Sequence, residues 1–307
     1  MSVSENLQIP QTSARRFPEL KAMVELLKPI TWFPPMWAYL CGIVSVGVWP
    51  GESWALVILG VVLAGPVVCG MSQVANDWCD RHVDAINEPG RPIPSGRVPP
   101  NWALGYAIAL SVLSLWIGSF LGPWGLGATV VAVVAAWIYS VEPIRLKRSG
   151  WWGPGLVGLS YETLPWFTGA AVLSVGAPSF PVVVVAVLYG IGAHGIMTLN
   201  DFKALEGDRV MGIKSLPVLV GPEVAAKIAC LMMALPQMIV ISMLLVWGRP
   251  VFAAVVGASL LAQFWAMRVM MRDPKAKAPW YNATGVTLYV SGMMVTAFAI
   301  RTLEISL

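Results

Sequence analysis

Residues 55–84 read ALVILGVVLAGPVVCGMSQVANDWCDRHVD, an apolar run that leads directly into a cluster of carboxylates. The part from Val57 to Val74 holds almost no ionisable group, and it approaches the roughly 20 apolar residues that cross the hydrocarbon core of a bilayer. The stretch therefore predicts a transmembrane helix that ends in acidic side chains at one face of the membrane.

The rest of the chain repeats this apolar pattern. Of its 307 residues, 57% are hydrophobic and 12% are charged, whereas soluble domains carry about 25% charged residues. The runs are apolar on every side, unlike the alternating strands of a membrane barrel. We therefore expect an all-α integral membrane protein with about nine transmembrane helices, over residues 30–49, 55–77, 101–122, 124–142, 153–174, 179–200, 222–247, 250–271 and 281–302.

The segment before the first span is polar. Residues 1–28 lack the basic start and the apolar stretch of a cleavable signal peptide. We expect a tail with a short amphipathic helix near Phe17–Leu27, followed by a single transmembrane domain over residues 29–303. The four cysteines form no CxxC pair, so we expect neither a disulfide nor a zinc site.

The basic residues are distributed unevenly between the two sides of the predicted bundle. Of 20 Lys and Arg residues, all except Arg249 and Arg301 fall in the tail or in the loops on the same side as the tail. Because loops rich in Lys and Arg stay in the cytoplasm, we expect the tail and these loops to be cytoplasmic. This distribution also accounts for the net charge of +4 without a nucleic-acid partner.

The acidic cluster at the end of the second span has the spacing of a helical stripe. In NDWCDRHVD (residues 76–84), Asn76, Asp80 and Asp84 share one face of a helix, and Asp77 lies beside them. Like charges at this spacing repel one another, so a divalent cation would stabilise the cluster. Mg²⁺ fits because it prefers oxygen ligands and usually binds one or two carboxylates together with substrate phosphates.

A related string, NDFKALEGDR, closes the sixth span. The spacing of the first string recurs here 124 residues later, in Asn200, Asp201 and Asp208. Ala204 stands where Asp80 would be, and Glu206 is the residue that could restore the lost carboxylate. A solvated acidic helix end is the simpler interpretation of one such string, but two matched strings at one membrane face favour a duplicated metal site.

Cations accompany both acidic strings. Arg91 follows the first and Lys214 the second, while Lys147 and Arg148 follow the fourth span on the same side. Because diphosphate oxygens are bound by metal ions together with Lys and Arg donors, we expect these residues, with Asn200, to bind a diphosphate. The alternative for each cation is that it only fixes the topology of its loop.

Two ionisable side chains lie deeper, Glu162 in the fifth span and His194 in the sixth. Ionisable groups at membrane depth are functional candidates by default. His194 lies about one and a half turns before Asn200, so it could face the same cavity and bind an acceptor. A histidine hydrogen-bonded between two helices is an equally good interpretation, and Glu162 is expected to pair with a neighbouring helix.

The two strings together resemble those of the UbiA superfamily of intramembrane prenyltransferases, over about residues 25–300. NDWCDRHVDAINEP and RPIPSG (residues 76–89 and 91–96) look like the chlorophyll synthase branch, and the details WC and RH look closest to bacteriochlorophyll synthases. The resemblance implies nine helices around a central cavity, in which Mg²⁺ assists transfer of a geranylgeranyl or phytyl group from its diphosphate to the propionate of a bacteriochlorophyllide. It also implies a bacterial cytoplasmic (inner or intracytoplasmic photosynthetic) membrane, with other enzymes of pigment biosynthesis as partners.

The resemblance assigns roles to single residues as well. By this resemblance Asn76, Asp80, Asp84, Asp201 and Asp208 hold the metals. The expected metal set also includes Asp77 and Glu206, which the two strings themselves suggest. Arg91, Lys147 and Lys214 would bind phosphates, and Tyr139 would lie near the reacting carbon. The expected catalytic set is Tyr139 with Asp80, Asp84 and Asp208. Ala204 departs from the second motif of the wider family, which leaves the ligand set there open.

Three other functions are open at this point. A UbiA-type enzyme could act on chlorophyllide, a quinone precursor or haem, although alkylation of an aromatic ring would need a base for the final proton loss. A transporter is disfavoured, because transport sites usually lie near the membrane midplane in interrupted helices. A structural pigment-binding protein would not need two matched acidic strings.

Overall fold

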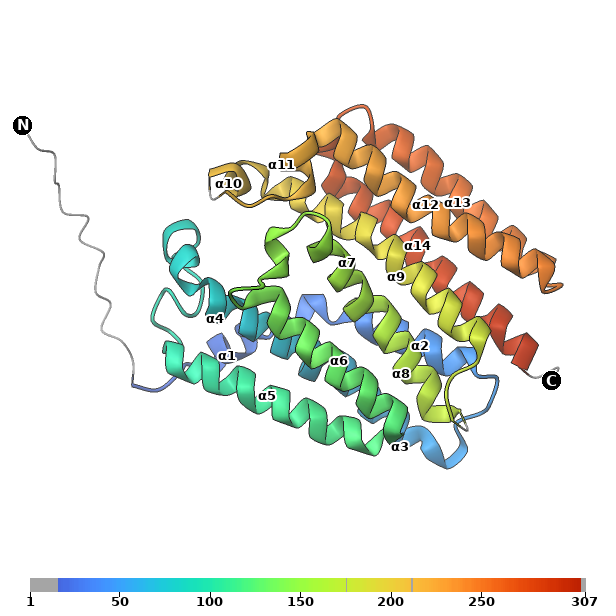
Figure 1. Ribbon diagram of the computed structural model, residues 1–307, viewed down its shortest axis with the longest axis horizontal. Coiled ribbons are helices and arrows are strands. Elements are labelled where there is room, and N and C mark those ends of the chain that lie inside the picture. Colours follow the sequence, from blue (N-terminus) through green and yellow to red (C-terminus); the bar gives the residue numbers. More distant parts are fainter. Residues whose placement is uncertain (1–15, 175, 211, 305–307) are drawn as a thin grey trace, which may run out of the picture.

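The computed structural model describes residues 16–174, 176–210 and 212–304, which form a bundle of long helices joined by short connections (Figure 1). The helical elements in chain order are α1 (Leu20–Leu26), η1 (Pro29–Thr31), α2 (Phe33–Ser45), η2 (Gly51–Ser53), α3 (Trp54–Val62), η3 (Leu63–Cys69), α4 (Gly70–Asn87), α5 (Pro100–Phe120), α6 (Gly122–Ser140), η4 (Leu146–Arg148), α7 (Trp152–Gly158), η5 (Leu159–Thr163), α8 (Leu164–Leu173), α9 (Phe180–Asn200), η6 (Asp201–Lys203), α10 (Leu205–Val210), α11 (Leu216–Val220), α12 (Pro222–Val246), α13 (Pro250–Met270) and α14 (Pro274–Glu304).

Seven helical stretches within the described residues are long and apolar enough to cross a membrane. They correspond to seven of the predicted spans, while the spans 30–49 and 153–174 fold as the shorter α2 and as the segmented helix α7–η5–α8. The second span runs past its predicted end at residue 77, because α4 continues to Asn87. The all-α membrane architecture is confirmed, and the first acidic string lies wholly within one helix.

Two of the spans widen into π-helical turns in the interior of the bundle. One is η3, which contains Pro66, a residue without an amide hydrogen to donate to the helix; the other is η5. The hydroxyl of Tyr161 in η5 lies 3.3 Å from Cys69 Sγ and accepts a hydrogen bond of 3.0 Å from Gln73 Nε2. These bonds join the second and fifth spans, and π-turns of this kind are frequent at functional sites.

Helices α2 and α8 approach each other closely at two glycines. A Cβ on Gly42 would lie 2.0 Å from the carbonyl oxygen of Trp166, and a Cβ on Gly169 would lie 2.1 Å from the carbonyl oxygen of Tyr39. Small residues allow such close approach of backbones between membrane helices. The glycines therefore hold the short α2 directly against α8.

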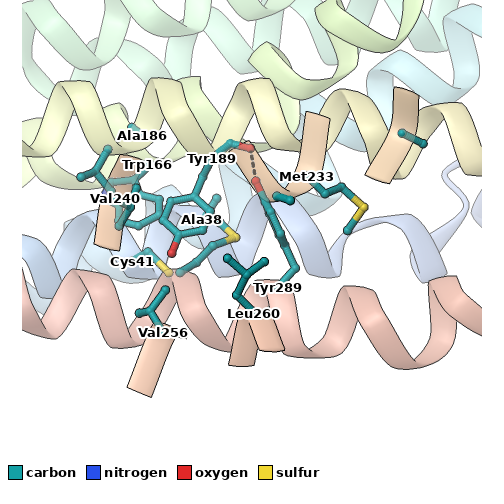
Figure 2. Packing of buried hydrophobic residues seen from close by; sticks show 14 of the residues in the cluster. Ala38, Cys41, Trp166, Ala186, Tyr189, Met233, Val240, Val256, Leu260 and Tyr289 are labelled. Carbon is teal, nitrogen blue, oxygen red and sulfur yellow. Dashed lines mark hydrogen bonds between the residues drawn. The ribbon is translucent and has the colours of Figure 1, made fainter. Parts of the chain in front are cut away.

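Figure 2 shows part of the largest buried cluster, to which α2, α8, α9, α12, α13 and α14 contribute. Tyr289 Oη donates to the carbonyl oxygen of Tyr189 at 2.7 Å, and the Tyr189 hydroxyl lies 2.8 Å from Thr296 Oγ1. Gln237 and Gln263 exchange two amide hydrogen bonds of 3.0 and 2.9 Å. Lipid offers these polar groups no partners, so the bonds specify how α9, α12, α13 and α14 pack.

The segment before the first span contains α1, at the position of the predicted amphipathic helix. Ala22 and Leu26 of α1 are buried in a second cluster, to which α4 and α5 contribute. The carboxylate of Glu25 accepts two hydrogen bonds from Arg97, at 2.6 and 2.9 Å. Residues 1–15 of the predicted tail lie outside the described residues.

The contact at Gly42 provides a test of the packing. Gly42→Ala should destabilise the folded protein by about 1–3 kcal/mol or more, because the added Cβ meets backbone atoms of α8 that cannot move aside separately. The melting temperature of the purified protein in detergent measures the effect. Gly105→Ala in α5 is the matched control, since a Cβ there meets nothing within 4 Å; equal melting temperatures would contradict the packing.

Candidate active site

A charged chamber of about 600 Å³ lies where α4, α6 and α9 end on one side of the bundle. Its lining includes most of the acidic and amide residues of the two strings, together with several cations. These polar residues are Lys28, Asn76, Asp80, Asp84, Asn87, Glu88, Arg91, Tyr139, Arg145, Lys147, Arg148, Asn200, Asp201, Lys203, Asp208 and Ser215. The chain therefore gathers at one place the two strings that lie 124 residues apart in sequence.

The first string presents a stripe to this chamber because α4 stays helical from residue 76 to residue 87. Asn76, Asp80 and Asp84 recur every four residues on that helix, and all three line the chamber. Asp77 turns away from it; its carboxylate is buried and accepts a hydrogen bond of 2.7 Å from Lys28 Nζ. The structure thus separates Asp77 from the other residues of the stripe.

The carboxylate of Asp80 is held between two cations. Arg145 donates to Asp80 Oδ1 at 2.7 Å, and Lys147 donates to Asp80 Oδ2. Burial lowers the pKa of the Lys147 ammonium, against the opposing effect of the Asp80 carboxylate. With its amide oriented to satisfy both atoms, Asn76 donates to Asp80 at 3.3 Å and accepts from Lys147 at 3.0 Å, so the stripe and the loop after α6 form one network.

Arg91 is the cation that pairs with the carboxylate at the other end of the stripe, Asp84. Its guanidinium bonds to Asp84 Oδ2 at 2.9 Å and to both carboxylate oxygens of Glu88, and it lies 3.6 Å from Asp77. Burial alone would lower the pKa of Arg91, but Glu88, Asp77 and Asp84 raise it. The guanidinium is therefore a fixed positive charge in the wall of the chamber.

Two of the chamber cations sit on unusual backbone. Lys28 has a φ of 46° and Arg145 a φ of 39°, and they are the only residues other than glycine with positive φ in the described part of the chain. Such backbone costs of order 1–3 kcal/mol for a residue with a Cβ, and it concentrates at functional sites. The fold therefore accepts local strain in order to bring these two cations to the carboxylates.

The second string reaches the chamber by a different local structure. Helix α9 ends at Asn200, Asp201 begins the short η6, and Asp208 lies in α10. Asn200 Oδ1 accepts a hydrogen bond of 2.7 Å from Asn282 of α14. Burial raises the pKa of Asp208, and a hydrogen bond with Ser215 opposes that rise. None of the ion pairs between described residues involves Asp201 or Asp208, in contrast to the first string.

The structure does not bring every predicted residue to the chamber. Glu206, expected to replace the carboxylate lost at Ala204, is exposed and accepts from Lys275 at 2.8 Å. Lys214 is exposed and absent from the lining, although its neighbours on both sides belong to it. Arg148 reaches the rim but pairs with Glu142 and is 58% exposed.

His194 lies away from the chamber, so it does not face the same cavity as Asn200, which was one of the two positions considered for it. It lines a separate groove with Trp151 and Gly155, and its Nε2 lies 3.1 Å from the carbonyl oxygen of Trp151. Its Nδ1 lies 3.4 Å from Thr198 Oγ1. With both ring nitrogens engaged, the histidine bonded between helices is the interpretation that this geometry favours.

Sequence reasoning passed over four residues that take part in the site. Lys28, Arg145 and Lys203 line the chamber, and Asn282 holds Asn200 from α14. The loop string PIRLKR contained a signal for Arg145, but nothing in the string distinguishes which of its cations turns inward. Asn282 is an isolated polar residue in an apolar span, and no other polar residue at helical spacing indicated that it belongs to the site.

A second, apolar chamber of about 180 Å³ continues from the first into the bundle. Asn76, Tyr139 and Met197 line both chambers and therefore mark their junction. The π-turns form much of the apolar wall, through residues such as Val68 and Tyr161. A polar compartment and an apolar compartment thus meet at the ring of Tyr139.

The side chains of the charged chamber supply only part of the ligand shell that a magnesium ion needs. Among the described residues, no group of three or more His, Cys, Asp and Glu side chains could hold a metal ion without other ligands. Carboxylates instead face the chamber from α4, η6 and α10. This arrangement fits Mg²⁺ that takes one or two carboxylates and completes its shell with water and phosphate oxygens.

The sequence profile of the UbiA prenyltransferase family matches residues 31–291. The chain belongs to this family. It is therefore a multi-pass membrane prenyltransferase, and the two joined chambers are its candidate active site.

Similar proteins agree with this membership. The bacteriochlorophyll synthase 33 kDa chain of Cereibacter sphaeroides is 70% identical over 291 residues, covering 95% of this chain and 96% of that protein. The chloroplastic chlorophyll synthase of Oryza sativa is 37% identical over 289 residues, covering 91% of this chain and 76% of that protein. A UbiA homolog from Archaeoglobus fulgidus, solved with GPP and Mg²⁺ bound, superposes with a TM-score of 0.71 at 20% identity, covering 92% of this chain and 99% of that one. This last likeness concerns the fold.

Two lysines predicted to bind diphosphate now differ in position, and this difference can be tested. Lys147→Gln should raise the KM for the prenyl diphosphate about tenfold or more, because a hydrogen bond to a charged group contributes about 1.5–3 kcal/mol. Lys214→Gln should leave the KM near its original value, since this side chain is exposed and outside the chamber lining. Initial rates over a range of diphosphate concentrations measure both, and a larger effect at Lys214 would contradict the site.

Proposed function

We propose that this prenyltransferase esterifies the propionate of a bacteriochlorophyllide with a geranylgeranyl (or phytyl) group and releases diphosphate. The observation that carries the proposal is the junction at Tyr139, where the charged chamber opens onto the apolar one. The first compartment suits a diphosphate and the second an isoprenoid chain, so the bond to be broken would lie between them. The 70% identity with a bacteriochlorophyll synthase supports this choice of acceptor.

The cations of the chamber would bind the diphosphate by exchanging partners. Arg145 and Lys147 now bond to Asp80, and Arg91 bonds to Asp84. Phosphate oxygens would take over these donors, and the released carboxylates would hold Mg²⁺. Because an unpaired buried charge is costly, this exchange is favourable only when metal and diphosphate enter together. When bound, Mg²⁺ supplies positive charge that stabilises the departing diphosphate.

The transfer itself needs little from the protein beyond placement. The bond between the prenyl carbon and the diphosphate oxygen breaks with its electron pair on the diphosphate, and an acceptor carboxylate oxygen forms the new bond to that carbon. The acceptor is already ionised at neutral pH, so no general base is required. The face of Tyr139 can stabilise an allylic cation, and apolar wall residues such as Ala132 and Ala135 keep water away from it.

Of the other acceptors, chlorophyllide fits the junction equally well and a quinone precursor fits it less well. Chlorophyllide, supported by the 37% identity with a chlorophyll synthase, offers the same propionate and is the second candidate. A quinone precursor would need a base for its final proton loss. Of the residues that line both chambers, Asn76, Tyr139 and Met197, none is a base at neutral pH.

We place the charged chamber at the cytoplasmic face of a bacterial inner membrane. The support is the distribution of Lys and Arg, which concentrate on the loops around the chamber and leave Arg249 and Arg301 at the opposite end. The acids lie at helix ends, whereas transport sites lie near the midplane, which argues against a transporter.

The proposed reaction can be tested directly. Purified protein with Mg²⁺, geranylgeranyl diphosphate and bacteriochlorophyllide should yield an esterified pigment, detected by chromatography and mass spectrometry. Addition of EDTA should abolish the product, and excess Mg²⁺ should restore it. Competition between geranylgeranyl and phytyl diphosphate, and between bacteriochlorophyllide and chlorophyllide, would rank the substrates. Absence of any ester with each divalent cation tried would refute the proposal.

Two acidic residues on the same short helix give a matched test of the metal ligands. Asp208→Asn should lower kcat about 100-fold or more while the protein stays folded, because a metal ion contributes several kcal/mol of charge stabilisation. Glu206→Gln should have little effect, since it loses only an exposed ion pair with Lys275. Both variants are compared by kcat and by melting temperature. Similar losses at the two positions would remove α10 from the proposed metal site.

A further inference from the structure

A groove of about 910 Å³ runs along the outer face of α12 and α13, and it shares no lining residue with the charged chamber. In Figure 1 these two helices lie side by side at one edge of the bundle. The groove walls include Leu231, Leu235 and Met238 from α12 and Phe264 and Trp265 from α13. The prenyl-transfer reaction uses none of these residues.

The walls of the groove are apolar and open to the surroundings. Leu231 is 61% exposed, Leu235 and Met238 are each 49% exposed, and Trp265 is 66% exposed. Such surface on a membrane protein faces acyl chains, and a hollow of this size offers them a fixed path. The apolar wall alone does not distinguish one lipid from another.

Two cations at one end of the groove can distinguish lipids by the charge of their head groups. Lys227 lies near the start of α12 and Arg268 near the end of α13, and both line the groove. No ion pair between described residues involves either of them. The nearest acids in sequence, Glu223 and Asp273, are absent from the lining. Among the described residues, the two cations at this end therefore have no acidic partner within the groove lining.

The cationic end lies on the same side of the bundle as the charged chamber. Lys275, in the first turn of α14, bonds to Glu206 of α10, and α14 follows α13 after a short turn. A basic pocket between transmembrane helices, at the end that the Lys and Arg distribution assigns to the cytoplasm, has the form of a site for an anionic lipid head group.

We propose that this groove binds one anionic phospholipid, whose phosphate lies between Lys227 and Arg268 and whose acyl chains follow the walls of α12 and α13. The charge complementarity selects an anionic head group over a zwitterionic one. The bound lipid would hold α12 against α13 from outside, while Gln237 and Gln263 join the two helices from inside.

The test compares phosphatidylglycerol with phosphatidylcholine, titrated into delipidated full-length protein in detergent. Phosphatidylglycerol should raise the melting temperature, and native mass spectrometry should detect one bound lipid. The double variant Lys227→Gln/Arg268→Gln should weaken this binding about tenfold or more, and its prenyl transfer should be unchanged. Lys275→Gln, an exposed cation on the same side but outside the groove, should bind the lipid normally.

A second variant tests the apolar walls of the groove without changing its two cations. Leu235→Trp should fill the groove and reduce lipid binding while Lys227 and Arg268 stay in place. Equal effects of the two lipids, or a phosphatidylglycerol effect that survives the double variant, would overturn the proposal. It would also be overturned if the groove were covered by a second copy of the chain, seen as a dimer that the Leu235→Trp variant dissociates.

Discussion

The pairing of Asp80 with Arg145 and Lys147 is the interaction on which the arrangement of the site depends. Carboxylates spaced every four residues on α4 would repel one another, yet α4 is helical through all of them. Cations from two separate segments neutralise Asp80 and Asp84, namely Arg91 in the loop after α4 and Arg145 with Lys147 in the loop after α6. Lys28 before η1 pairs with the neighbouring Asp77. The same bonds hold these segments against the end of α4, so one set of charges both stabilises the acidic helix and positions the loops of the site.

The parts of this arrangement that follow from helix periodicity could be predicted from the sequence. The stripe of Asn76, Asp80 and Asp84 needs only 3.6 residues per turn and a helix that continues. The apolar runs similarly predicted where the spans lie. The structure added that α2 is short and that Pro66 and η5 widen two spans, details that depend on contacts with other helices.

The loop residues could not be predicted in the same way, because their direction depends on backbone turns that no periodicity governs. Arg145 has a left-handed backbone conformation and its side chain reaches Asp80, whereas Arg148, three residues later, pairs at the rim with Glu142. Lys214 and Glu206 had suitable spacing, but Lys214 lies in a connection and Glu206 in the short helix α10, and both side chains are exposed. Spacing therefore predicted which residues of the continuous helix α4 face the chamber, and it failed for Lys214 and Glu206, which follow the break after Asn200.

The two strings match in sequence but differ in structure, and the difference has a chemical meaning. The first remains one helix whose acids are paired with cations, while the second breaks after Asn200 and offers Asp201 and Asp208 from separate elements without a basic partner among the described ion pairs. Under the proposed function the strings divide the work. The second provides carboxylates that a metal ion can take without displacing a cation. The first holds, on Asp80 and Asp84, cations of the flanking loops that a diphosphate can draw away, which would free these carboxylates for the metal as well.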